Sequence, residues 1–214
     1  MELQLILTIP VLLFAVITHE VAHGYVAYLC GDNTAKLQGR LTFNPIPHID
    51  VFGTLLFPLI LIITKAPILF GWAKPVPVNP WNLRNPKKHH LYVSLAGISA
   101  NLMLAVLCTL GYGLYVNLFH PSTVNDLVLQ VFYFGIRINV ILAVFNIMPI
   151  PPLDGSWVLF HLLPEHLANT YRKIFPYGFP ILVLLLLTNV LQNIIIPIYN
   201  VILQFLSAIL SLIV

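Results

Sequence analysis

Apolar residues occur along this chain in long runs that few polar positions interrupt. Crossing a bilayer as a helix takes roughly 20 apolar residues. Residues 3–30, 91–119 and 127–150 meet that length. Residues 179–214 have room for two short spans, and we expect a break around Pro197, because proline disturbs a helix interior. The pattern therefore predicts a bundle of membrane helices.

Two shorter patterns lie between the first two spans. Residues 51–64 form an apolar run of 14 residues, too short for a full crossing, which predicts a re-entrant or interfacial segment. Residues 35–43 alternate apolar and polar side chains around Gly39, a period typical of a β-strand. We therefore expect an all-α polytopic membrane protein of about five to six membrane segments. A short re-entrant and β-hairpin region would separate the first two spans.

Composition supports lipid as the solvent of most of the chain. Of the 214 residues, 59% are hydrophobic and 8% are charged, whereas soluble domains carry about 25% charged residues. We expect one membrane-embedded domain over residues 1–214, with a core at 3–160 and peripheral spans at 176–214. The net charge of +3 is spread over the loops, which argues against nucleic acid as a partner.

The distribution of basic residues predicts the orientation of the spans. Loops rich in Lys and Arg stay in the cytoplasm. Residues 120–126 contain neither, so the first span is expected to run from outside to inside and the second to return. The basic residues between those two spans are Lys36, Arg40, Lys65, Lys74, Arg84, Lys87 and Lys88.

The first span carries three ionisable residues within one helical turn. His19 and His23 are four positions apart, so on a helix both imidazoles face the same way. With Glu20 between them they form the H-E-x-x-H arrangement of zinc hydrolases. Ionisable groups inside a membrane helix are costly and usually functional. The alternative is that these side chains only hydrogen-bond to neighbouring helices.

A catalytic zinc site needs a third protein ligand, and Asp154 is the best candidate. It follows a proline-rich turn at the inner end of the third clear span, and Gly155 beside it frees the backbone. The alternative is that Asp154 merely caps the next helix. His23 and Asp154 can meet only if their two spans run parallel. That requires an even number of crossings between residues 30 and 91.

These motifs resemble the site-2 protease family of intramembrane zinc metalloproteases, and most of all its compact prokaryotic members without a PDZ domain. The family usually has proline where this chain has Ile98. The matching stretches are HEVAHGYVAYLCGD at 19–32, GRLTFNPIPHIDVFGTLLFP at 39–58, FGWAKPVPVNPWNLRNPKK at 70–88, AGISAN at 96–101 and FNIMPIPPLDG at 145–155.

The resemblance implies a role for each matching residue. His19, His23 and Asp154 would bind one Zn²⁺ ion, and Glu20 would be the catalytic base. Asn146 would orient the substrate or steady the oxyanion. The implied activity is hydrolysis of peptide bonds in or near transmembrane segments of membrane proteins. The active site would face the cytoplasmic side of the cell membrane.

Other interpretations remain open at this point. A non-proteolytic membrane protein could bind zinc for transport or regulation, and a silent scaffold could bind membrane helices. Another class of membrane zinc protease, the CAAX type, would take its third ligand from a glutamate such as Glu165. His48 and Asp50 could support the zinc ligands or simply belong to a loop. Arg137, inside the third clear span, is expected to pair with a carboxylate or a backbone carbonyl. The oligomeric state is not set by the sequence.

Overall fold

The computed structural model describes residues 2–64, 71–119, 124 and 126–213 of the chain. Within these residues all regular structure is helical, and no strand is present. The α-helices are α1 Glu2–Leu29, α2 Thr34–Leu37, α3 Phe57–Ile63, α4 Pro86–Leu118, α5 Asp126–Asn146, α6 Asp154–Leu162, α7 Glu165–Arg172, α8 Gly178–Leu187 and α9 Val190–Leu210. Short 3₁₀ turns at Ile46–His48, Pro80–Asn82 and Phe175–Tyr177 and a π-helix at Val51–Leu56 connect them.

Five helical stretches in the described chain are long and apolar enough to cross a membrane, judged by length and composition. This number confirms the predicted class of an all-α polytopic membrane protein. The five stretches are Leu7–Leu29, Pro86–Leu118, Asp126–Asn146, Glu165–Leu187 and Val190–Leu210.

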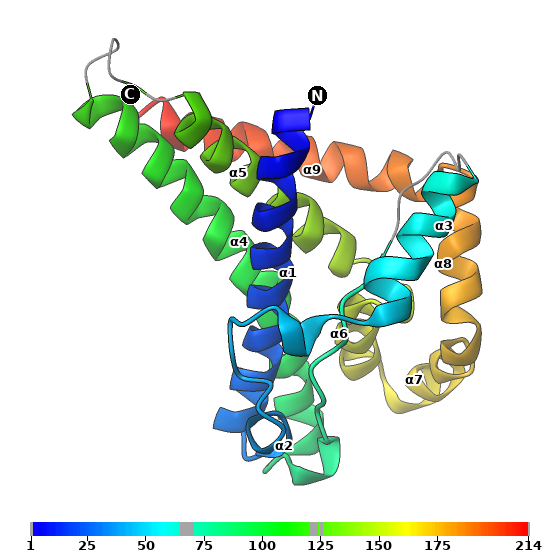
Figure 1. Ribbon diagram of the computed structural model, residues 1–214. Coiled ribbons are helices and arrows are strands. Elements are labelled where there is room, and N and C mark those ends of the chain that lie inside the picture. Colours follow the sequence, from blue (N-terminus) through cyan, green and yellow to red (C-terminus); the bar gives the residue numbers. More distant parts are fainter. Residues whose placement is uncertain (1, 65–70, 120–123, 125, 214) are drawn as a thin grey trace.

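Helices α1, α4 and α5 form the part of the bundle that positions the chemistry (Figure 1). The Arg84 backbone N–H donates to the Cys30 carbonyl at 3.0 Å, so the end of α1 lies beside the start of α4. The Asn85 side chain caps α4 by accepting from the Lys88 N–H. Because α1 ends where α4 begins, the chain between them makes an even number of crossings. This is the condition under which His23 and Asp154 can meet.

The strand predicted between the first two spans is wrong, because local hydrogen bonds fold this stretch into α2. Asp32 Oδ1 accepts from the Thr34 N–H at 3.0 Å and starts the turn. The Arg40 N–H returns to the Ala35 carbonyl at 2.9 Å. Gly39 closes the turn with a φ of +64°, a conformation that glycine adopts without strain. A helix of one turn is too short to show its own period, so the alternation was misleading.

The apolar run after α2 forms a π-helix that continues into α3. The Asp50 side chain caps its start by accepting from the Gly53 N–H at 2.6 Å. The Trp72 N–H then donates to the Gly53 carbonyl, and the Lys74 N–H donates to the His48 carbonyl. The chain thus leaves and returns at the same place, while its entry into the membrane stays a prediction. Residues 65–70, with the predicted cytoplasmic Lys65, lie outside the described residues.

The C-terminal helices break at a different residue from the one predicted. Pro197 lies inside α9. The chain turns at Asn189, whose φ is +58°. Asparagine tolerates this left-handed conformation better than most residues. Helices α8 and α9 share an apolar core with α4, α5 and the turn after α5, which consists of Ala105, Val140, Val144, Met148, Leu153, Leu182, Leu191, Ile195 and Leu206.

Candidate metal centre

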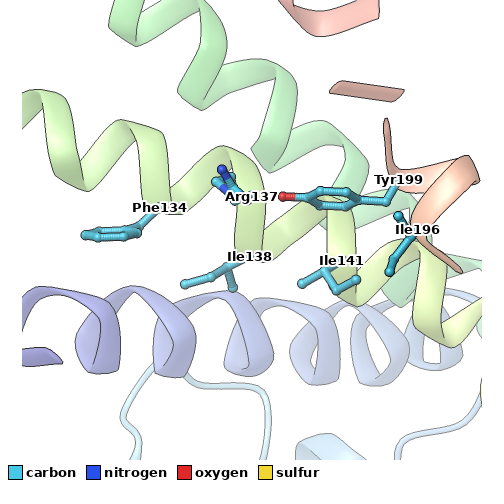
Figure 2. Close-up of a pocket in the computed structure, with 6 residues that line it drawn as sticks. All are labelled: Phe134, Arg137, Ile138, Ile141, Ile196 and Tyr199. Atoms are coloured by element: carbon cyan, nitrogen blue, oxygen red, sulfur yellow. The ribbon is translucent and has the colours of Figure 1, made fainter. Parts of the chain in front are cut away.

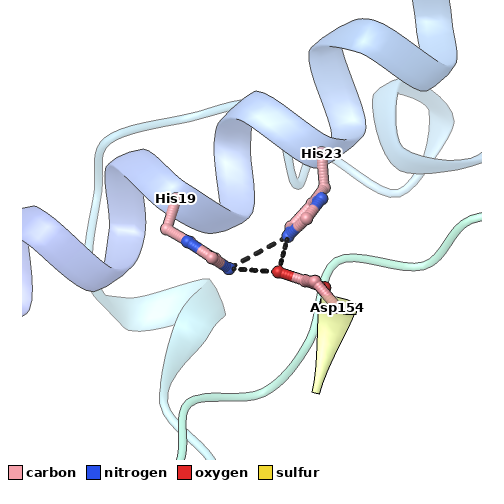
Figure 3. A group of neighbouring side chains, drawn as sticks. All are labelled: His19, His23 and Asp154. Carbon is pink, nitrogen blue, oxygen red and sulfur yellow. Dashed lines mark hydrogen bonds and ion pairs between the residues drawn. The ribbon is translucent and has the colours of Figure 1, made fainter. Parts of the chain in front are cut away.

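Three side chains predicted as metal ligands meet between α1 and the start of α6 (Figure 3). The Asp154 Oδ2 atom lies 3.0 Å from His19 Nε2 and 3.2 Å from His23 Nε2. The two Nε2 atoms are 3.0 Å apart. Both imidazoles are buried. One nitrogen from each ring and one carboxylate oxygen therefore converge on a single point.

The backbone places these side chains by simple means. The helical period of α1 puts His19 and His23 on one face. Residues 147–153 form the turn after α5, and Asp154 is the first residue of α6. A Cβ atom on Gly155 would lie 2.0 Å from the Ile147 carbonyl oxygen, so only glycine lets α6 start this close to the turn. The cap position of α6 is Leu153 and not Asp154, whose carboxylate points at the histidines instead.

The opposite ring nitrogens decide which tautomer each histidine adopts. His19 Nδ1 lies 2.7 Å from Asn101 Oδ1, and His23 Nδ1 lies 2.7 Å from the Val93 carbonyl oxygen. Both partners are acceptors, so each Nδ1 carries the proton. Each Nε2 therefore keeps a lone pair free for a cation. The hydrogen bonds to α4 complement metal binding in the way that supporting contacts of metal ligands do.

The residues present fit a zinc ion. Asp154 Oδ2 is buried and has no hydrogen-bond partner among the described residues, so it is available to a cation. A Cβ on Gly97 would lie 2.5 Å from His19 Cε1 and from His23 Nε2, so this glycine keeps the space around the ligand atoms open. Two imidazoles and a carboxylate are a donor set that zinc accepts. Tetrahedral bonds of about 2 Å place ligand atoms about 3.3 Å apart, close to the separations seen here.

Glu20 lies beside this group and is held by a distant part of the chain. Its Oε2 atom accepts from the Val76 backbone N–H at 2.7 Å. Val76 belongs to a segment without regular secondary structure at residues 71–79. The buried Arg40 anchors that segment, since its Nη2 donates to the Lys74 carbonyl at 2.7 Å. No pattern in the sequence predicts the contact between Val76 and Glu20.

Other residues singled out from the sequence do not join the ligand group. The Asn146 amide donates to the Leu142 carbonyl of its own helix at 3.0 Å. His48 Nε2 bonds the Thr42 carbonyl at 2.9 Å. Asp50 caps the π-helix, so these last two residues organise the loop in which they lie.

Arg137 lines a separate, open pocket of about 360 Å³ between α5 and α9 (Figure 2). Its guanidinium donates to the Tyr133 hydroxyl and lies 5.2 Å from the centre of that ring. The Tyr199 ring lies 6.0 Å away. The expected carboxylate or carbonyl partner is thus replaced, in the described part of the chain, by tyrosines.

Comparisons with known proteins agree on one family. Residues 113–188, which include Asp154, match the sequence model of peptidase family M50. The chain is 39% identical over 188 residues to "Putative zinc metalloprotease YwhC" of Bacillus subtilis, covering 85% of this chain and 80% of that protein. It is 35% identical over 196 residues to "Putative zinc metalloprotease Rip2" of Mycolicibacterium smegmatis, covering 88% and 69%. No solved structure matches the chain.

Proposed function

The chain belongs to peptidase family M50, and from this premise we propose that it is an intramembrane protease of the site-2 type. It is a multi-pass membrane metalloprotease whose cofactor is zinc. Its substrates are transmembrane proteins, cleaved in or near their membrane segments. The observation that carries the proposal is the convergence of His19, His23 and Asp154 beside Glu20. A carboxylate next to two helical histidines is what hydrolysis needs and what zinc transport does not.

Each residue has a distinct role in the proposed reaction. His19, His23 and Asp154 hold the zinc ion, which when bound supplies a Lewis acid that polarises a peptide carbonyl and acidifies water. Glu20 accepts the proton of the attacking water and later delivers it to the leaving amine. The Val76 N–H keeps the Glu20 carboxylate in place before the substrate arrives. Asn146 orients the substrate or steadies the oxyanion after its amide leaves the Leu142 carbonyl.

The location of the reaction follows from the basic loops. Residues 31–85 carry all five of the Lys and Arg that precede α4, and such loops face the cytoplasm. We therefore place the active site toward the cytoplasmic side of the cell membrane. The segment around α3 enters the bilayer from that side and returns to it. Residues 1–214 act as one membrane-embedded domain in this proposal.

The proposal is tested with three variants purified in detergent and assayed for metal content and for cleavage of a model single-span substrate. Glu20→Gln should lower the cleavage rate by at least about 100-fold, the usual contribution of a general base, and keep one zinc per chain. Asp154→Ala should lose the zinc. Glu165→Gln, the matched control, should keep both properties. Unchanged cleavage by Glu20→Gln would contradict the proposed role of that residue.

A further inference from the structure

Beyond its ligands, the zinc centre is connected to a chain of buried amides that crosses three helices. Asn101 on α4 is completely buried, and Asn139 on α5 is 3% exposed. Asn101 Oδ1 faces His19 Nδ1 at 2.7 Å, and Asn101 Nδ2 donates to Asn139 Oδ1 at 2.8 Å. Asn139 Nδ2 in turn donates to the Gly135 carbonyl at 2.8 Å. Buried polar groups are costly unless every one is paired. In this row of hydrogen bonds, each amide oxygen and nitrogen of Asn101 and Asn139 has a partner.

Backbone carbonyls fix the direction of each hydrogen bond in the row from His19 through Asn101 and Asn139 to Gly135. The Gly135 carbonyl accepts only, so Asn139 must present its amide nitrogen there and its oxygen to Asn101. The Ala15 carbonyl accepts from Asn101 Nδ2 at 3.2 Å, which favours the same orientation. Asn101 must then present its oxygen to His19. An oxygen in that position requires the proton on Nδ1 and leaves Nε2 free for the metal.

The reversed amide would oppose metal binding. If Asn101 turned over, its Nδ2 would face His19 Nδ1 and favour the tautomer with the proton on Nε2. Its oxygen would then meet the Ala15 carbonyl oxygen and the Asn139 oxygen, both of which repel it. Asn139 supplies the shorter of the two contacts to Asn101 Nδ2, at 2.8 Å against 3.2 Å from Ala15. The contact with Asn139 therefore contributes more than the contact with Ala15 to fixing the orientation of the Asn101 amide.

We propose that Asn139 is a positioning residue for zinc, which acts through Asn101 to hold His19 in the metal-binding tautomer. It touches neither the metal nor the substrate. The inference rests on the proposed zinc site and adds to it a residue on α5, the helix that leads to Asp154. Packing alone does not account for Asn139, because an apolar residue of similar size would fill the same space without needing partners.

The test compares zinc affinities by competition with a chromophoric chelator. Asn139→Leu removes the hydrogen bond to Asn101 while keeping a side chain of similar volume. It should weaken zinc binding by about tenfold or more, the range found for partners of metal ligands. Asn139→Asp should restore binding to within about threefold, since a buried carboxyl stays protonated and offers the same acceptor and donor. Thr109→Val is the control, because Thr109 is buried on α4 but bonds only its own helix.

A second readout keeps the test decisive if Asn139→Leu proves unstable. Nitrogen NMR of labelled histidines in the zinc-free protein reports the tautomer of His19, assigned by comparison with His19→Asn. The parent and Asn139→Asp should show the proton on Nδ1. Asn139→Leu, or Asn139→Ser in its place, should show the other tautomer as well. Equal zinc affinity and an unchanged tautomer would overturn the role of Asn139, whereas a parent that binds no zinc would overturn the proposed function.

Discussion

At the scale of single residues, the metal centre depends on the absence of a side chain at Gly97. A Cβ there would meet His19 Cε1 and His23 Nε2 at 2.5 Å, a separation that real Cβ contacts do not reach. The two imidazoles cannot retreat, because each Nδ1 is already bonded to α4. The smallest possible substitution should therefore disturb the ligands more than the fold.

We expect Gly97→Ala to weaken zinc binding by about tenfold or more, measured by chelator competition. Gly113→Ala is the matched control on the same helix. A Cβ there would contact the ends of Ile213 and Leu210 at 2.9 and 3.1 Å, and these side chains can adjust. Similar zinc affinities for the two variants would show that the imidazoles can move enough to accommodate a Cβ atom at residue 97, contrary to this prediction.

The convergence of the three candidate metal ligands could be predicted from the sequence, but their supporting contacts could not. His19, Glu20 and His23 follow from the helical period, and Asp154 from its place after the proline-rich turn at the inner end of the third span. The partners of these residues lie 82 positions away for His19, 70 for His23 and 56 for Glu20. Such contacts depend on how helices pack, and no local pattern records them.

At the scale of elements, the fully buried carboxylate of Asp32 joins α1, α2 and the 3₁₀ turn before α4. It accepts from Thr34, from the Asn79 N–H at 2.6 Å and from the Asn82 amide at 3.0 Å. Burial acts to raise the pKa of Asp32, but these hydrogen bonds outweigh it and hold the pKa below its ordinary value. The ionised form is therefore the one that the fold stabilises.

This shift predicts a pH dependence of stability. Because the folded pKa of Asp32 lies below the unfolded value of about 3.9, its contribution is complete above that pH and is lost as the pH falls through the folded pKa. Asp32→Asn should cost about 2 kcal/mol at pH 7, as expected for hydrogen bonds to a charged group. Thermal unfolding of both proteins should show the difference in Tm shrinking toward pH 3. A difference that does not change with pH would contradict this role of the charge.

Elements were predictable where they are long and missed where they are short. The three clear spans lie within a few residues of α1, α4 and α5, since lipid demands long apolar runs. The one-turn α2 was missed because Asp32 and Gly39 define it, rather than any repeat. The break at Asn189 was assigned to Pro197 because the sequence does not show that a proline will be accommodated inside α9.

At the scale of the whole molecule, hydrogen bonds and packing contacts define which end of the bundle each terminus occupies. Helix α4 starts beside the end of α1 and finishes at the opposite end of the bundle. Near that far end, the Asn117 amide donates to the Ile213 carbonyl. The start of α8 lies at the other end, because Gly178 packs directly on Pro151 after α5. Helices α8 and α9 together therefore make one net crossing, although Glu165–Leu187, which includes α8, and Val190–Leu210 each pass as a span by length and composition.

Helix lengths explain how two helices share one crossing. The 10 residues of α8 extend about 15 Å, half of a hydrocarbon core of about 30 Å. The turn at Asn189 then directs α9 across the bundle, crosswise to α1, so that its end lies near the end of α4 (Figure 1). If the basic loops face the cytoplasm, as proposed, residue 213 would lie on the outer side, together with the start of α1.

We therefore expect a reporter fused after Val214 to lie outside the cytoplasm. An alkaline phosphatase fusion, which needs an oxidising compartment, should be active, and a fusion to a fluorescent protein that matures only in the cytoplasm should be dark. A cysteine at exposed Gln38, with Cys30 and Cys108 replaced by alanine, should react with an impermeant maleimide only in inverted vesicles. A fluorescent C-terminal fusion would mean that α8 and α9 each cross fully. The contact between Asn117 and Ile213 would then be incompatible with the protein in its membrane.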